Sequence, residues 1–234
     1  MREDLEQQEQ FDAIKGFWRE NRRWILPLFI AIVGGWTTYQ GYRLWDASRA
    51  EEASIYLGRL ELALEQQKLD EAMANGDRLI KDFSGTTQAA LGALRIAKAQ
   101  VMAGDLEKAA GFLEKASNHS DPSIAWIARL RHAAVLIDLD RLDAALKVLD
   151  GKPPASFEAA VLDRRGDVLL LLNRFDEART AWESAKKAYA TAGPQGGGRS
   201  EELLGRKLST LDAFKASLAD TPAVSSQSKS GTKQ

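Results

Sequence analysis

Residues 157–185 read FEAAVLDRRGDVLLLLNRFDEARTAWESA, and this stretch decides the fold of the 234-residue chain. Its segment RFDEA, at 174–178, matches three earlier segments of the sequence. These are KLDEA at 68–72, DLEKA at 105–109 and RLDAA at 141–145. Their final alanines are spaced 37, 36 and 33 residues apart, and each follows a large apolar residue by three positions. Recurrence at such a period indicates a repeat architecture.

A repeat of two antiparallel helices explains this pattern. A small residue near the start of the second helix lets the two helices approach closely, and the large residue one turn earlier fills the gap between them. This is the logic of the tetratricopeptide repeat, whose usual period is about 34 residues. The residues expected to pack the repeats are Ala72, Ala109, Ala145, Gly166, Phe175, Ala178 and Trp182.

The rest of the sequence favours an all-α fold. Alanine, leucine and charged residues dominate, as helices prefer, and no stretch shows sustained strand alternation. We expect repeat helices over 68–82, 87–103, 106–117, 122–138, 142–149, 155–172 and 175–191. After a glycine-rich loop at 193–198, apolar residues between Leu203 and Leu218 predict an amphipathic helix that caps a tetratricopeptide-like α-solenoid. From residue 220 the Ser/Lys-rich tail is expected to be disordered.

An uncharged run precedes the repeats. Residues 24–42 contain no charged side chain, and as a helix they span roughly 28 Å, about the thickness of bilayer hydrocarbon. A signal peptide is the alternative, but the acidic stretch before this run is unlike a short basic leader. We therefore expect helices near 10–20 and 23–66, with a single transmembrane helix at 24–45.

Basic residues predict the orientation of this helix. Lys15, Arg19, Arg22 and Arg23 precede the span, whereas only Arg43 and Arg49 follow closely. The positive-inside rule then makes 1–23 a cytoplasmic arm and places the domain at 46–219 in the periplasm. Gly34, Thr38 and Gly41 form a seam of small residues that either packs against another helix or reflects the ordinary frequency of glycine in membrane helices.

No convincing catalytic motif is present. The sequence has no cysteine, which excludes disulfides, thiolate metal sites and cysteine nucleophiles. His119 falls in a polar turn and His132 in a helix, where surface and packing roles are expected. The pair Asp163 and Asp167 alternates with basic residues and suggests a solvated charged face. We expect no enzyme, cofactor or metal, and the net charge of −1 argues against nucleic acid as a partner.

Binding is the function that such repeats support. The first helices of successive repeats line a groove, which suits an extended or helical peptide. The motif positions predict that this groove is lined by Leu91, Leu94, Lys98, Val101, Ile127, Leu130, Ala134 and Ile137. The fourth repeat adds Ala160, Asp163, Asp167 and Leu170. Alternatively, the capping helix or the N-terminal helix covers part of this surface.

The chain resembles one bacterial family, the ancillary SecYEG translocon subunits, also called YfgM-like. The resemblance covers roughly residues 10–190. It rests on the arm at 11–23, on Tyr42–Arg43–Leu44–Trp45, on Leu91–Gly92–Ala93–Leu94 and on residues 157–185. The pattern D-x-R-G-[DE]-x-L…A-R-x-A-W-E, at 163–169 and 178–183, is its most specific part. The loop at 193–199 and the tail depart from the family pattern.

The resemblance implies a non-enzymatic accessory protein of the bacterial inner membrane. Such proteins associate with the SecYEG translocon and with a membrane-anchored periplasmic chaperone of the PpiD type, and they help to hand newly translocated proteins to periplasmic folding factors. Without the resemblance, two other scaffolds remain open. One is an envelope assembly, cell-division or secretion accessory with no link to the translocon. The other is an organelle receptor whose repeats face the cytosol, which the basic flank argues against.

Overall fold

The computed structural model describes residues 2–191 and 198–220, and all secondary structure within those ranges is helical. The helices are α1 (Arg2–Glu65), α2 (Leu69–Asp82), α3 (Thr87–Met102), α4 (Leu106–Ser117), α5 (Pro122–Asp138), α6 (Leu142–Val148), α7 (Ala155–Leu171), α8 (Phe175–Thr191) and α9 (Gly198–Asp220). The expected all-α repeat fold is confirmed. The glycine-rich loop and the tail lie almost wholly outside the described residues.

The chain divides into two compact units, residues 1–52 and 53–234. The first unit is the N-terminal part of α1, which runs without the interruption expected near residues 20–23. Asn21, which could have capped a new helix there, donates its side-chain N–H to the Phe17 carbonyl (2.9 Å). Pro27 consequently lies well inside α1 and not in the first turns of a shorter helix.

Hydropathy does not confirm the expected transmembrane helix. Across the described ranges, no helix combines the length and the apolar content needed to cross a membrane. In the segment 24–45 the polar residues Thr37, Thr38 and Gln40 lower the apolar content of the second half.

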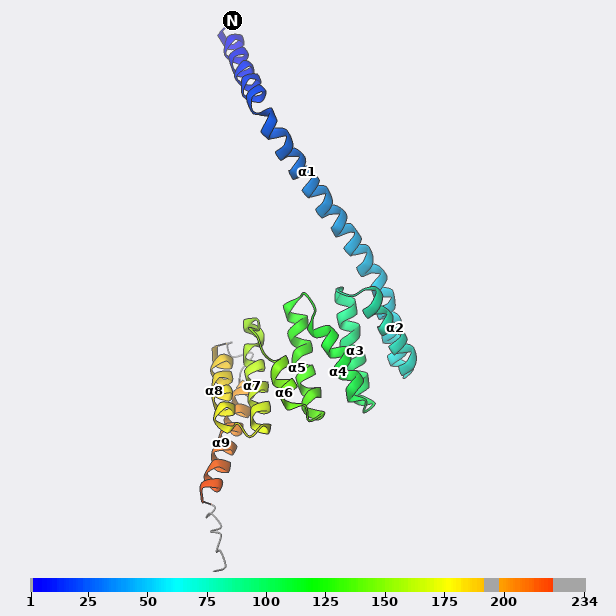
Figure 1. Ribbon diagram of the computed structural model, residues 1–234, viewed down its shortest axis with the longest axis vertical. Coiled ribbons are helices and arrows are strands. Elements are labelled where there is room, and N and C mark those ends of the chain that lie inside the picture. The colour runs from blue at the N-terminus through cyan, green and yellow to red at the C-terminus, as the bar shows by residue number, and fades with distance from the viewer. Residues whose placement is uncertain (1, 192–197, 221–234) are drawn as a thin grey trace, which may run out of the picture. The chain divides into compact units, whose positions relative to one another are not determined.

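The second unit is a row of paired helices. We call the end of α1 (residues 53–65), α3, α5 and α7 the A helices, and α2, α4, α6 and α8 the B helices. Figure 1 shows α2 to α9 following one another along this unit in chain order. The observed bounds differ from those expected by one or two residues at most, except that α9 begins at Gly198, five residues before Leu203.

The same turn joins A to B in every pair. One residue in each turn has a left-handed conformation: Gln67 (φ 59°), Gly104 (φ 83°), Asp140 (φ 58°) and Asn173 (φ 58°). The next amide donates to the carbonyl five residues back, as in Arg174 N–H to Leu169 O (2.9 Å) and Arg141 N–H to Leu136 O (2.8 Å). This geometry satisfies carbonyls at the end of each A helix and reverses the chain.

Small residues set the distance between paired helices. Ala72, Ala109, Ala145 and Ala178 are all 0% exposed. In the last pair, Gly166 on α7 faces Trp182 on α8, which is 1% exposed. A Cβ at Gly166 would lie 2.4 Å from Trp182 Cδ1 and Nε1, so only glycine fits against the indole here.

The core runs through the row as three apolar clusters. Leu60, Leu79 and Ile96 belong to the first, which joins the end of α1 with α2 to α5, and Trp126, Leu149 and Val168 belong to the second, from α5 to α7. The third joins α7 and α8 to α9 through Leu204 (0% exposed) and Leu211 (2%). Helix α9 therefore caps the row, as expected from its apolar stripe.

We predict that Gly166→Ala lowers the free energy of unfolding by about 1–3 kcal/mol, because the added methyl forces the indole and α8 outward. Gly58→Ala is the matched control. Gly58 is also helical, but a Cβ there meets no atom within 4 Å, so this change should stabilise by up to about 1 kcal/mol through helix propensity. Chemical unfolding of both variants measures the difference, and equal effects would contradict the packing role of Gly166.

Candidate functional site

The candidate site is the surface of the A helices, which we call the A-helix face. On α3 this face exposes Leu91 (41%), Val101 (39%) and Met102 (79%), and Lys98 is also exposed. Two contacts link α3 to the end of α1 along this face: Gln88 donates to Ser54 Oγ (3.2 Å), and Arg95 pairs with Glu61 (3.4 Å).

A pocket of about 330 Å³ opens between the end of α1 and α3. Leu64, Leu69 and Met102 supply its apolar side chains, and Arg95 and Lys98 supply charge. Met102 and Lys98 lie one turn apart on α3 and so project on the same side. A pocket of this kind can take an apolar side chain of a peptide whose acidic or polar groups reach the two cations.

The middle of the expected groove is less open than its start. Ile127 packs on the first core cluster, and Leu130 and Ile137 pack on the second. All three are half-buried, as is Ala134. Leu94 is only 6% exposed and belongs to the first core cluster, so a charge at this position would be buried in the core.

The far end of the face is closed by the capping helix. Lys207 on α9 donates to Asp163 Oδ1 (2.6 Å) and Asp167 Oδ1 (2.5 Å) on α7. Trp182 Nε1 donates to the Asp163 carbonyl and to Asp167 Oδ1, both at 3.2 Å. Burial disfavours the charge of Lys207, but its hydrogen bonds to both carboxylates outweigh this effect and raise the pKa of the lysine. The two acids are therefore half-buried in an ionic cluster, and not on the solvated face expected from sequence.

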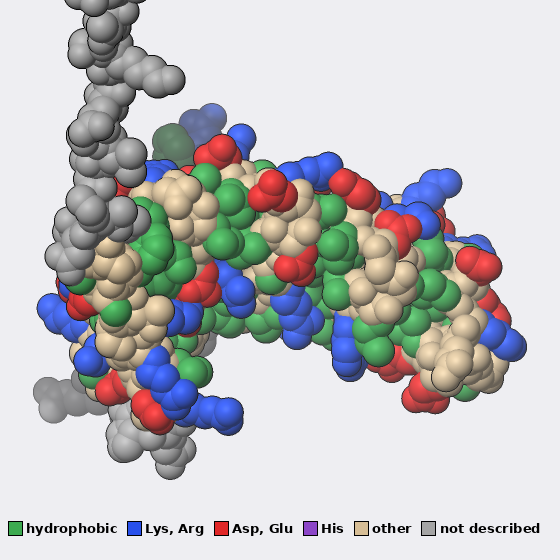
Figure 2. Space-filling model, turned by 90° about the horizontal axis from the view of Figure 1, so that it is seen from below, with side chains coloured by type: hydrophobic (Ala, Val, Ile, Leu, Met, Phe, Trp, Pro, Cys, Tyr) green, Lys and Arg blue, Asp and Glu red, His purple; other side chains and the backbone are tan. Residues whose placement is uncertain are grey.

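Charge is mixed over the unit. Figure 2 shows acidic and basic side chains interspersed with hydrophobic ones on the face that it draws. Among the described residues, no group of three His, Asp or Glu side chains has the arrangement of a metal site. Apolar side chains beside scattered charges of both signs are suited to binding polypeptide.

Comparison with known proteins identifies the family. The family model described as a tetratricopeptide repeat-like domain matches residues 15–213. An ancillary SecYEG translocon subunit of Escherichia coli (strain K12) is 31% identical over 187 residues, covering 78% of this chain and 88% of the relative. One of Neisseria gonorrhoeae is 30% identical over 176 residues, covering 74% and 84%. The chain belongs to the ancillary SecYEG translocon subunit family.

Membership of this family agrees with the resemblance seen in the sequence, and the protein is non-enzymatic. Among solved structures, the crystal structure of MamA protein matches 72% of this chain and 91% of its own chain, with 18% identity and a TM-score of 0.47.

Sequence reasoning missed the three large apolar side chains of the α3 pocket: Leu64, Leu69 and Met102. Leu69 is the large apolar residue of the first repeat motif, but its place in a pocket depends on how the end of α1 packs on α3. Of these three, only the exposure of Met102 could have been inferred from the sequence. It lies one turn beyond Lys98 on α3 and is the last residue of the helix, where an apolar side chain lacks a partner.

Among the described titratable side chains outside this face whose pKa is clearly shifted, His132 on α5 is the most buried. It is 7% exposed, and its Nδ1 is buried without a hydrogen-bond partner. Burial lowers the pKa of His132, and Glu114 on α4 opposes only part of this effect. The folded chain therefore holds this imidazole neutral at a pH where the unfolded chain already protonates it.

We predict that stability falls on mild acidification because of His132. Its contribution is fully present above the unfolded pKa, near 6.5, and is lost as the pH falls toward the lower folded pKa. Between pH 7.5 and 5.5 the free energy of unfolding should drop by up to about 1.4 kcal/mol from this residue. His132→Leu should remove that part of the drop, as urea unfolding of both proteins at the two pH values would show. An identical drop in both would contradict the burial argument.

Proposed function

We propose that this protein is a non-enzymatic scaffold of the SecYEG translocon that binds partner or newly translocated polypeptides through its A-helix face. The relatives are named for the translocon, which supports the association. The observation that carries the binding role is the pocket at α3, with Met102 79% exposed beside Lys98 and Arg95. Apolar surface that no other part of the described unit covers is a ready site for a polypeptide.

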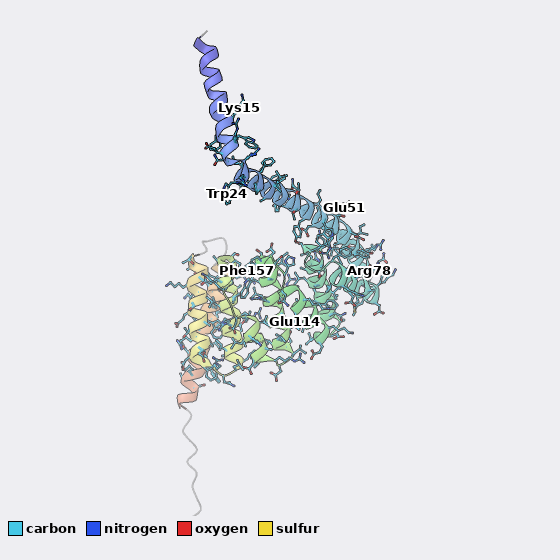
Figure 3. The ribbon with its side chains drawn as sticks, turned by 45° about the horizontal axis from the view of Figure 1, so that its top comes forward. Lys15, Trp24, Glu51, Arg78, Glu114 and Phe157 are labelled. Carbon is cyan, nitrogen blue, oxygen red and sulfur yellow. The ribbon has the colours of Figure 1, made fainter. Side chains whose placement is uncertain are left out.

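The N-terminal unit supports attachment to the bacterial inner membrane. Its large side chains lie exposed around α1: Trp24 82%, Phe29 63%, Ile30 64%, Ile32 62% and Trp36 64%. Figure 3 shows side chains standing outward along this helix between Lys15 and Glu51. Water is a poor solvent for such a helix, so we propose that residues 24–45 lie in lipid, with 1–23 cytoplasmic and the repeats periplasmic.

The seam of Gly34, Thr38 and Gly41 stays within this proposal as a surface for a neighbouring membrane helix. Thr38 Oγ1 donates to the Gly34 carbonyl (2.8 Å), which keeps its hydroxyl satisfied inside lipid. A Cβ at Gly34 or Gly41 would meet nothing within 4 Å, so close approach of another backbone is sterically open. The partners we propose are SecYEG, a PpiD-type membrane-anchored chaperone, and unfolded or newly translocated proteins.

The binding role predicts where clients crosslink. A photoreactive amino acid at Met102 or Leu91 should crosslink to SecY or to a translocation-arrested secretory chain, because these exposed positions flank the α3 pocket. The same amino acid at Lys186, an exposed position on α8, is the matched control and should not crosslink to either. Met102→Glu should reduce crosslinking from Leu91 at least fivefold while thermal unfolding stays unchanged.

Two other outcomes of this crosslinking experiment would contradict part of the proposal. Equal crosslinking from Lys186 would remove the A-helix face as the binding surface. Crosslinking from Met102 to envelope proteins, with none to SecY or the arrested chain, would favour an assembly, cell-division or secretion scaffold that has the same architecture but no link to the translocon.

Membrane attachment predicts a second result. A reporter that is active only in the periplasm should be active when fused after residue 219 and inactive when fused before Lys15. Alkaline extraction should leave the protein in the membrane, and replacement of Ile30 and Ile32 by arginine should release it, because charges at the centre of the span are costly in lipid. Extraction of the unaltered protein, or a reporter active at both ends, would overturn the topology.

A further inference from the structure

The opposite surface of the repeats contains a gap where one helix is cut short. The B helices α2, α4 and α8 have 14, 12 and 17 residues, whereas α6 has seven and ends at Val148. Lys152–Pro153–Pro154 follows, and the prolines stop the chain from continuing the helix. The last turns that a full-length α6 would place beside α4 are therefore missing.

A depression of about 650 Å³ lies between α4 and the shortened α6, over α5. A second depression of about 400 Å³ lies on the other side of the C-terminal end of α4. Its lining includes four alanines, among them Ala90, Ala93 and Ala116. Asn118, which follows α4, lines both depressions. The floor of small side chains lets a second backbone approach closely.

Each depression contains one of the two histidines of the chain, and each histidine has an unused nitrogen. His132 lines the larger one, is 7% exposed, and has a buried Nδ1 without a hydrogen-bond partner. In the smaller one, the Asp121 N–H donates to His119 Nδ1 (3.0 Å), so the proton of the neutral ring is on Nε2. That Nε2 is also buried and has no acceptor.

Buried polar atoms without partners are uncommon, and a bound group is one physical explanation for them. Among the described residues, the only other buried side-chain atom of this kind is Gln88 Oε1. A ligand that serves both sites must accept from His119 Nε2–H and pair with His132. The main chain of an extended peptide does this, because it offers N–H and C=O groups at regular spacing.

The charges around the depressions favour an acidic peptide. Glu107 is already held by Arg141 through two hydrogen bonds (3.0 and 2.6 Å), and Asp150 is held by Arg165 (2.6 Å). The remaining charged side chains at the rims are three cations and one acid: Lys115, Arg129, Lys147 and Glu114. Figure 3 places Glu114 in the middle of the repeat unit, where this surface lies.

The two depressions lie along the B helices α4 and α6, on a surface that we call the B-helix face. We propose that they form one docking groove, and that its occupant is an extended, acidic segment of a partner protein. Main-chain groups of the segment satisfy His119 and His132, and its carboxylates meet Lys115 and Lys147. None of the residues that line the α3 pocket or the expected groove lines these two depressions, so the two sites can hold different polypeptides at the same time.

The two histidines provide the test, because each reports on one depression. The full chain in lipid nanodiscs, with ¹³C-labelled histidine, is titrated with the synthetic peptide Ac-GAEVDAEVG-NH2 up to millimolar concentration. We expect both imidazole signals to shift with one common binding curve. The basic peptide Ac-GAKVKAKVG-NH2 should shift both signals at least tenfold less at the same concentration.

Matched variants separate the groove from non-specific charge. Lys147→Glu should weaken binding of the acidic peptide at least tenfold, and Lys115→Glu, in the other depression, should do the same if Lys147→Glu perturbs folding. Lys187→Glu makes the same charge change on exposed α8, outside both depressions, and should change affinity less than twofold. Met102→Glu, on the A-helix face, should leave the titration unchanged.

Several outcomes would overturn the groove. These are unshifted signals with the acidic peptide, equal shifts with the basic peptide, a shift of only one histidine, or equal loss of affinity in Lys187→Glu and Lys147→Glu. Because none of these readouts depends on SecYEG or on the α3 pocket, failure here leaves the proposed scaffold role standing.

Discussion

The close approach of paired helices at small residues is the constraint on which the rest of the structure depends. At Gly166 the helices α7 and α8 come so near that a single methyl group would overlap the Trp182 indole. The buried alanines Ala72, Ala109 and Ala145 permit the same approach in the earlier pairs. Once each pair is fixed in this way, its outer surfaces are fixed too, and stacking of neighbouring pairs produces one continuous core.

Because each repeat contacts only the neighbouring repeats, the sequence of one repeat can vary without disturbing the others. The first two pairs keep an open apolar surface at α3, whereas the last pair is covered where Lys207 bridges Asp163 and Asp167. The second helix of the third pair has only seven residues, yet Leu149 remains 0% exposed and holds the shortened α6 to the core. Differences between repeats therefore concentrate on the surfaces, where a scaffold distinguishes its partners.

The sequence predicted the paired helices well because their signals are local. The spacing of the alanines, the prolines at 122 and 153–154 and the apolar stripe of α9 each depend on nearby residues. Three of the four left-handed turn residues, Gly104, Asp140 and Asn173, are of types that tolerate positive φ, whereas Gln67 is not. Burial of Leu94 and the Lys207 bridge were not readable. Both depend on contacts between helices far apart in the chain, with 44 residues separating Lys207 from Asp163. The continuity of α1 past Asn21 and Pro27 was also missed, because two residues typical of helix ends lie inside one helix.

The buried histidine shows how stability and binding are connected in this fold. A neutral His132 with an unsatisfied Nδ1 stabilises the unit less than an apolar side chain of similar volume would. The shortened α6 also stabilises the unit less than a full-length helix would, because it makes fewer helix contacts, and a depression lies between it and α4. Both departures from good packing occur at one place on the B-helix face, while the core on either side is complete. Defects scattered at random along a repeat protein would not coincide in this way. Their coincidence is what a bound polypeptide explains, because it supplies both the missing contacts and the missing hydrogen bond.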